Sequence, residues 1–203
     1  MKRVIGIAVA LLFSPTVYAI ECGDPSPFGS DAEQYLAEVE KQSLTNDEQH
    51  DIRRLFTQLE GDWSGSGVSI TCKTENGEEK ATEEDLEIRS TYEQIGENRL
   101  TEINELEFLS NQNIRSEKYT LHLQEGFLSN SSNVDHSTIG FVNVQDKELV
   151  YVYKTNIKAV TGGRVVIDTY TQYTLSITSM TAKVRYYANG VVSGWRVYTL
   201  KKR

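Results

Sequence analysis

Cysteine, histidine and tryptophan are scarce in this sequence, which has two cysteines, three histidines and two tryptophans in 203 residues. So few cysteines and histidines leave little material for a metal site, and neither a metal nor another cofactor is predicted. A site with two thiolates is the alternative use of the cysteine pair. The sequence also lacks the serine motif of hydrolases and the spacing of an EF-hand, so no catalytic residue is predicted. Enzymatic activity is left open, and a protein that is not an enzyme is favoured.

The apolar run at the N-terminus, residues 4–13, is too short to span a bilayer as a helix. It follows Lys2 and Arg3 and precedes the small residues Val17 and Ala19. This order predicts a secretory signal peptide over residues 1–19, cleaved after Ala19. We therefore expect a soluble bacterial protein of the periplasm or the medium, without a membrane span.

Basic side chains are few in the first two thirds of the chain. Residues 20–146 contain 9 basic and 27 acidic residues, whereas residues 147–203 contain 10 basic and 2 acidic residues. Removal of Lys2 and Arg3 with the signal peptide gives a net charge of about −10, which makes nucleic acid and anionic membranes poor partners. A sheet that closes on itself would bring the acidic first strands beside the basic last strands.

The two cysteines are Cys22 and Cys72. In an oxidising compartment a lone pair is most simply a disulfide. Such a bridge would close a loop of about 50 residues and stabilise the fold by about 4 kcal/mol in the chain-entropy description. We therefore expect the mature N-terminus to be tied to the first strand of the sheet.

Residues 20–58 predict an irregular lead-in and two short helices that pack on the rest of the chain. Ser30 can cap the first helix. Thr45 can cap the second, because Glu48 stands three residues later as in a capping box. The apolar face of the first helix carries Tyr35, Leu36 and Val39, and that of the second carries Ile52, Leu55, Phe56 and Leu59.

Helical patterns are absent after Gly61, where alternation of apolar and polar residues begins. The predicted strands cover residues 62–74, 82–95, 99–109, 114–124, 139–145, 148–157, 164–178, 181–189 and 191–201. Turn dipeptides such as Asn189-Gly190 stand between them and join antiparallel neighbours. Residues 59–203 therefore predict a mainly β fold, an antiparallel up-and-down meander barrel of about 8–10 strands. The polar stretch 129–137 is predicted to be a loop at its mouth.

Where the second helix meets the first strand, the sequence has the pattern L-x-G-x-W-x-G-x-G. Its residues are Leu59, Gly61, Trp63, Gly65 and Gly67. This start resembles that of the calycin group, in which lipocalins and fatty-acid-binding proteins share G-x-W, and its extended form looks like that of nitrobindin-type barrels. The resemblance implies a calycin-like barrel in which Trp63 plugs the closed end. The glycines after it would permit the bend and close approach that a first strand needs.

The resemblance does not extend to haem. Nitrobindin-type proteins hold haem through a histidine near the C-terminus. In this chain the histidines are His50, His122 and His136, and the last strands have none. Haem binding is therefore not expected.

The last strand has a second resemblance, because Arg196 and Tyr198 are similar to the Arg-x-Tyr pair with which fatty-acid-binding proteins grip a ligand carboxylate. A two-residue turn before this strand would pair Val184 with Trp195. The face opposite Trp195 would then carry Lys183, Arg185, Tyr187, Val192, Arg196 and Tyr198.

That face allows two interpretations, which the sequence leaves open. If it points outward, it is a solvated basic stripe, and Arg196 can pack over Trp63 as in lipocalins. If it points inward, it forms an anion clamp, since the planar arginine fork grips a carboxylate through two hydrogen bonds. The apolar face with Trp195 would then be covered by the N-terminal helices.

The sequence thus predicts a monomeric envelope protein that binds a small apolar or amphiphilic molecule inside a barrel. The candidate ligand-binding residues are Trp63, Arg185, Tyr187, Arg196 and Tyr198. The alternative is a protein-binding module without a small ligand, such as an inhibitor of a basic envelope enzyme. The net negative charge of the mature chain and the disulfide predicted at Cys22 suggest it. An isomerase or cyclase would need an interior cluster of ionisable residues, and the sequence names none.

Overall fold

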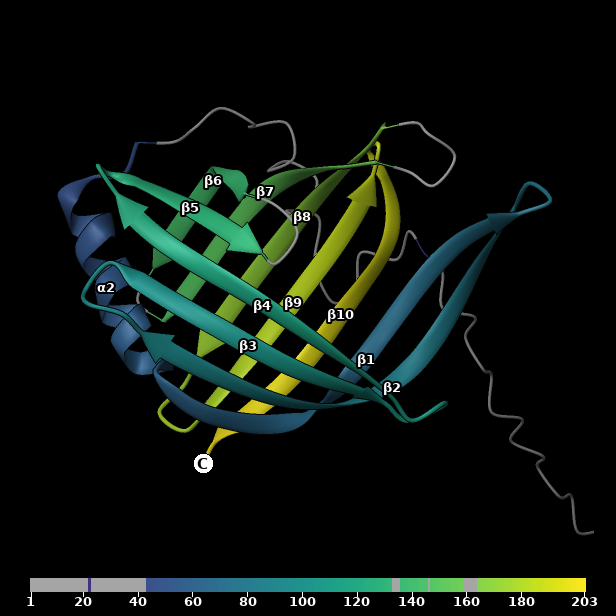
Figure 1. Ribbon diagram of the computed structural model, residues 1–203, viewed down its shortest axis with the longest axis horizontal. Helices are drawn as coiled ribbons and strands as arrows, with labels where there is room; N and C mark the ends of the chain where they lie inside the picture. Colours follow the sequence, from purple (N-terminus) through teal and green to yellow (C-terminus); the bar gives the residue numbers. More distant parts are fainter. Residues whose placement is uncertain (1–21, 23–42, 133–135, 146, 159–163) are drawn as a thin grey trace, which may run out of the picture.

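The computed structural model describes residue 22 and residues 43–132, 136–145, 147–158 and 164–203. The described residues form one helix and ten strands (Figure 1). The mainly β class is therefore confirmed. The predicted signal peptide, residues 1–19, and the first predicted helix, which Ser30 would cap, lie outside the described residues. Of the predicted pair of helices, the structure describes only the second.

The helix α2 (Asn46–Leu59) begins with the predicted capping box. The Thr45 hydroxyl accepts a hydrogen bond from the backbone N–H of Glu48 at 3.3 Å, and the Glu48 carboxylate accepts one from the backbone N–H of Thr45 at 2.7 Å. The predicted apolar face is fully buried and consists of Ile52, Leu55, Phe56 and Leu59. No helix among the described residues is long and apolar enough to cross a membrane.

The strands alternate with short turns through the rest of the chain. They are β1 (Gly61–Glu75), β2 (Glu78–Gln94), β3 (Arg99–Phe108), β4 (Asn113–Gln124), β5 (Phe127–Ser132), β6 (His136–Gln145), β7 (Glu148–Lys158), β8 (Arg164–Leu175), β9 (Ser179–Ala188) and β10 (Val191–Lys202). The prediction of a loop over residues 129–137 was wrong, because β5 and the start of β6 lie there. In β5, Leu128 and Asn130 are buried between less buried neighbours. A buried asparagine among serines hides the alternation on which the prediction relied.

The sheet closes into a barrel, because each strand pairs antiparallel with its sequence neighbours and β1 also pairs with β10. The predicted meander is thus confirmed. At this seam, a Cβ added to Gly65 would strike the carbonyl oxygen of Thr199, and one added to Gly67 would strike that of Val197. The glycines after Trp63 therefore let the first strand approach the last.

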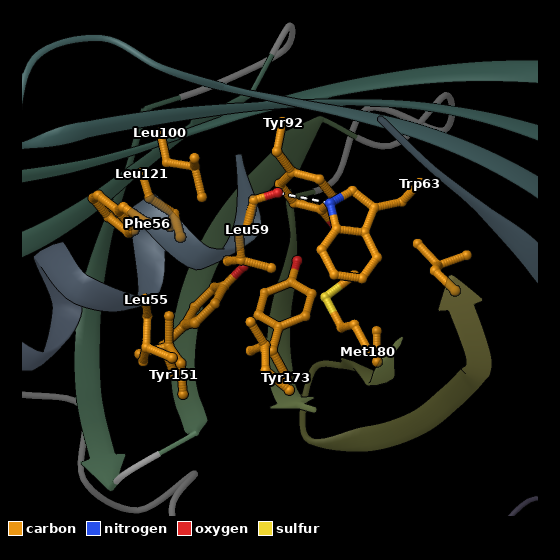
Figure 2. Close-up of a cluster of buried hydrophobic side chains, with 14 of the residues drawn as sticks. Leu55, Phe56, Leu59, Trp63, Tyr92, Leu100, Leu121, Tyr151, Tyr173 and Met180 are labelled. Atoms are coloured by element: carbon orange, nitrogen blue, oxygen red, sulfur yellow. Dashed lines mark hydrogen bonds between the residues drawn. The ribbon is translucent and has the colours of Figure 1, made fainter. Parts of the chain in front are cut away.

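One end of the barrel is closed by α2, which lies across it (Figure 1). Leu55, Phe56 and Leu59 pack there with Trp63 and Tyr92 in one buried cluster (Figure 2). The indole N–H of Trp63 donates a hydrogen bond to the carbonyl oxygen of Leu59 at 2.6 Å, and the ring meets Tyr92 edge to face at 6.5 Å between centroids. Side chains fill this half of the interior, so a ligand cavity must lie toward the other end.

The predicted register of the last two strands was wrong. A β-bulge after Val192 adds one residue to β10, so Trp195 faces Arg185 and Arg196 faces Val184. A slip of one residue transfers a side chain to the opposite face of a strand. The residues that were predicted to share one face are therefore divided: Arg196 and Tyr198 point into the barrel, whereas Arg185 and Tyr187 lie on the outer face with Trp195.

A second, smaller buried cluster lies on the outer face of the sheet. It consists of Ile70, Val150, Val152, Tyr170 and Trp195. Cys72 packs against this cluster and forms a disulfide with Cys22, with 5.7 Å between the two Cα atoms. The predicted pairing of the two cysteines is confirmed.

Beyond the open end of the barrel, β1 and β2 continue as a two-stranded ribbon (Figure 1). Their pairing extends to Glu75 and Glu78, whereas β3 pairs with β2 only as far as Leu86 and β10 pairs with β1 only as far as Thr71. The exposed charged residues of the ribbon are Lys73, Glu75, Glu78, Glu79, Lys80, Glu83 and Asp85. The acidic stretch of the sequence is thus a projecting hairpin.

Candidate binding cavity in the barrel

The open half of the barrel interior is polar and aromatic, in contrast to the closed half. Strand alternation places Glu102 and Asn104 of β3 and Glu117 of β4 inside, opposite tyrosines of β7 to β10. These side chains surround a deep cavity of about 30 Å³. Its lining is Glu102, Asn104, Leu106, Glu117, Tyr119, Tyr151, Tyr153, Thr171, Tyr173, Val184, Tyr186, Arg196 and Tyr198. A space of this size holds a water molecule or a small polar group.

A larger cavity of about 310 Å³ lies at the mouth of the barrel. It is lined by Arg115, Ser116, Glu117, Lys118, Tyr119, Ser132, Tyr153, Thr155, Ile167, Thr169 and Tyr186. Four of these residues also line the deep cavity, namely Glu117, Tyr119, Tyr153 and Tyr186. The two cavities are therefore neighbours, and a bound molecule in the mouth would meet the polar interior at its inner end.

Glu102 is the most enclosed carboxyl group of the deep cavity, with 5 % of its surface exposed. Its Oε1 accepts hydrogen bonds from the Tyr92 hydroxyl at 3.0 Å and the Asn104 amide at 2.7 Å, and its Oε2 accepts one from the Tyr173 hydroxyl at 2.8 Å. Burial raises the pKa of Glu102, and the three hydrogen bonds act in the opposite direction. None of the ion pairs among the described residues involves Glu102.

Glu117 stands between the deep cavity and the mouth and pairs with two arginines. Arg196 donates from Nη1 to both carboxylate oxygens at 3.1 and 3.0 Å, and Arg115 donates from Nε to Oε1 at 2.9 Å. The Tyr119 hydroxyl also donates to Glu117, at 3.0 Å. Arg196 is buried and Arg115 is mostly exposed at the rim. The interior guanidinium is therefore already matched by a carboxylate of the chain itself.

The tyrosines of the deep cavity remain neutral phenols. Burial, followed by the neighbouring charge of Glu102, raises the pKa of Tyr151, Tyr173 and Tyr198 well above the ordinary value, and it does the same for Tyr92 in the closed end. Tyr151 lies 6.1 Å from the ring of Tyr153 and 6.1 Å from that of Tyr173. The cavity thus offers hydroxyl groups for hydrogen bonds and aromatic rings for packing.

The five predicted ligand-binding residues occupy three different places. Arg196 and Tyr198 line the deep cavity. Trp63 lies in the filled closed end, and the ammonium group of Lys202 lies 5.4 Å from its ring centre. The alternative in which Arg196 packs over Trp63 was wrong, because Arg196 lies over the ring of Tyr186. Arg185 and Tyr187 are buried on the outer face, with the guanidinium 5.4 Å from the tyrosine ring centre.

The two interior carboxylates were not predicted from the sequence. Their strand phase was the available signal, because Glu102 is in phase with the buried Leu100 and Leu106 of β3. Glu117 is likewise in phase with the buried Leu121 of β4. Among the described residues, no group of three or more histidine, cysteine, aspartate or glutamate side chains is arranged to hold a metal ion.

Comparison with known proteins supports the barrel fold. No family model matches this chain, and no curated protein does so either. Among solved structures, the crystal structure of Rv2717c from M. tuberculosis matches with a TM-score of 0.53 and 13 % identity, over 79 % of this chain and 99 % of that chain. The structure of EF1p2_mFAP2b bound to DFHBI matches with a TM-score of 0.37 and 11 % identity, over 74 % of this chain and 98 % of that chain. The first likeness, at this low identity, concerns the fold alone.

Proposed function

We propose that this protein binds a small amphiphilic molecule in the open half of its barrel. The observation that carries the proposal is the joined pair of cavities, a mouth of about 310 Å³ that shares four lining residues with a polar deep cavity. Ligand cavities commonly have volumes from about 300 Å³ upward, with a few convergent polar groups. The less polar part of the molecule would lie against Ile167, Tyr153 and Tyr186, and its polar end would reach toward Glu102.

An amphiphilic ligand fits this interior better than a purely apolar one. The closed half, where apolar residues dominate, is filled by side chains around Trp63 and Phe56. Burial of an apolar group against the charged residues of the deep cavity would leave their polar atoms without compensation. Among the predicted residues, we assign ligand contact to Arg196 and Tyr198, while Trp63 would support the cavity from the closed end.

We further propose that the protein acts outside the cytoplasm after removal of residues 1–19. The disulfide between Cys22 and Cys72 supports this location, because such bonds persist in oxidising compartments. A ligand-binding role in the bacterial envelope would not require an enzyme activity or a cofactor.

The test is native mass spectrometry of the protein purified from its own host. A bound molecule should appear as a discrete mass shift that an organic extract identifies. Ile167→Trp would fill the mouth cavity and should abolish the shift. Ile177→Trp is the matched control, because Ile177 is 89 % exposed and lies between β8 and β9, away from both cavities. Unliganded protein in every preparation, or a shift that persists in Ile167→Trp, would refute the proposal.

A second candidate function, binding of a basic envelope protein, rests on the projecting ribbon. Its exposed residues carry five acidic and two basic side chains, namely Glu75, Glu78, Glu79, Glu83 and Asp85 with Lys73 and Lys80. A pull-down from envelope extract distinguishes the two functions. One stoichiometric partner that is released by salt and lost when Glu78, Glu79 and Glu83 become glutamine favours this alternative. Capture of no partner would exclude it.

A further inference from the structure

The deep cavity contains a carboxyl group that pairs with no described cation, Glu102, and the proposed function assigns it no specific partner. Its charged lining residues are Glu102, Glu117 and Arg196. Arg196 is matched by Glu117, with both carboxylate oxygens within 3.1 Å of one guanidinium nitrogen. Glu102 faces only neutral donors, the hydroxyls of Tyr92 and Tyr173 and the amide of Asn104. Glu117 also pairs with Arg115 at the rim, at 2.9 Å, so both arginines are directed at Glu117 and no ion pair among the described residues includes Glu102.

A second observation concerns an acceptor atom at the same place. Asn104 is 4 % exposed, and its amide nitrogen is turned toward Glu102. The amide oxygen, Oδ1, is buried and receives no hydrogen bond from any described residue. Buried acceptors without a donor are rare in proteins, and each lowers stability. Asn104 Oδ1 therefore needs a donor, and the neighbouring carboxyl group of Glu102 favours one that is positive.

The aromatic lining has the same preference. Six tyrosines surround the deep cavity, namely Tyr119, Tyr151, Tyr153, Tyr173, Tyr186 and Tyr198. The face of an aromatic ring attracts a cation through its quadrupole, and a desolvated site strengthens this attraction. A phenol hydroxyl is in addition an acceptor for an N–H donor. An anion could accept a hydrogen bond from Nε of Arg196, which is buried and receives no partner among the described residues, but it would also meet two carboxylates and the negative ring faces.

We propose, on the basis of the proposed function, that the polar end of the ligand is a primary ammonium group held in the deep cavity by Glu102 and Asn104. A primary ammonium is a compact group with three donors and no acceptor, which suits a space of about 30 Å³ lined by acceptors. A quaternary ammonium is too large for that space and has no N–H to donate. The ligand class is thus a small aralkyl or alkyl amine whose apolar part lies in the mouth cavity.

The test compares three probes that share a phenylpropyl skeleton: 3-phenylpropylamine, 3-phenylpropan-1-ol and 3-phenylpropionate. Isothermal titration at neutral pH should give at least about tenfold tighter binding of the amine, since hydrogen bonds to charged groups are the strong ones. Glu102→Gln should remove this preference, and Asn104→Leu should reduce it. Glu105→Gln is the matched control, because Glu105 is an exposed acid on the same strand. It should bind all three probes as the wild type does.

The results separate this inference from the proposed function. Equal affinity for the amine and the alcohol would overturn the ammonium site while the mouth cavity still binds. Tightest binding of the propionate would overturn it in favour of an anion site at Arg196. Absence of binding by all three at millimolar concentration would also overturn it, and the native mass spectrum then decides the proposed function independently. A thermal melt followed by circular dichroism confirms that Glu102→Gln and Asn104→Leu are folded. If one of them is not, the other carries the test of the residues, and the comparison of the three probes on the wild type stands by itself.

Discussion

The buried pair of Arg196 and Glu117 allows a sharp test of the polar interior. The two side chains are 10 % and 9 % exposed. If one of them is removed, the charge of the other therefore remains in a poorly hydrated place. Removal of one member of a buried pair destabilises a protein by about 3–5 kcal/mol, because the other charge stays buried without compensation. We expect Arg196→Met to lower the free energy of unfolding by about 3 kcal/mol. This is the lower end of the range, because Arg115 still pairs with Glu117 from the rim.

The double variant gives the decisive number. Glu117→Leu alone should lower the free energy of unfolding by about 3–5 kcal/mol, since it leaves the Arg196 guanidinium unpaired. Arg196→Met combined with Glu117→Leu removes both charges, so its free energy of unfolding should lie within about 2 kcal/mol of the wild type. Urea unfolding followed by the fluorescence of Trp63 and Trp195 measures all four proteins, provided that each transition is two-state.

The control for this cycle is Arg115→Met, which removes the exposed partner of the same carboxylate. Because Arg115 is 62 % exposed, the loss should be about 1 kcal/mol or less. Additive losses in the Arg196 and Glu117 double variant would refute the reasoning. Such a result would mean that water or another group solvates each charge and that the interior is not a desolvated site.

Three further predictions concern the rest of the fold. Phe56→Ala should lower the free energy of unfolding by about 3–5 kcal/mol in urea titrations, because the ring is fully buried at the closed end; a loss under about 1 kcal/mol would argue that α2 does not close the barrel. Cys72→Ser should lower the free energy of unfolding by about 4 kcal/mol, because it opens a loop of 50 residues. A reducing agent should lower the stability of the wild type but not that of the variant. Burial raises the pKa of Glu102, so the folded state holds its proton more tightly than the unfolded chain, and stability should fall as pH rises above about 4. Glu102→Gln should flatten that part of the pH profile of unfolding, and an unchanged profile would contradict the assignment.

Short-range patterns in the sequence predicted the helix, the strands and the glycines of the seam. The capping box of Thr45 and Glu48 depends on residues three apart, and the alternation in β2 depends on neighbours two apart. The glycines after Trp63 belong to the same kind of signal, because the seam needs them whatever the rest of the chain contains. Cys22 and Cys72 were predictable for another reason, since two cysteines allow a single pairing.

The candidate site depended on features that are not local. A bulge after Val192 changed the face of every residue beyond it in β10, and its only signal in the sequence is Ser193-Gly194, with an isolated glycine in the strand. Arg196 therefore points inward, while Arg185 does not. Glu102 and Glu117 resemble surface acids until the strand phase is compared with their leucine neighbours. Each accepts hydrogen bonds from one residue on a strand far along the chain, Tyr173 for Glu102 and Arg196 for Glu117, and only the closed barrel brings these pairs together.

The seam between β1 and β10 has a consequence for how the chain reaches this structure. Gly65 pairs with Leu200, so the barrel cannot close until almost the whole chain is available. Contacts between residues so distant in sequence slow folding, because a large loop must be ordered first. In the meantime, β1 presents an unpaired edge on which other chains can add a strand. Its seam segment, Ser64 to Gly67, consists of serine and glycine, which have low strand propensity. The small residues that allow the close approach of β1 and β10 thus also make the unpaired edge of β1 a poor template for aggregation.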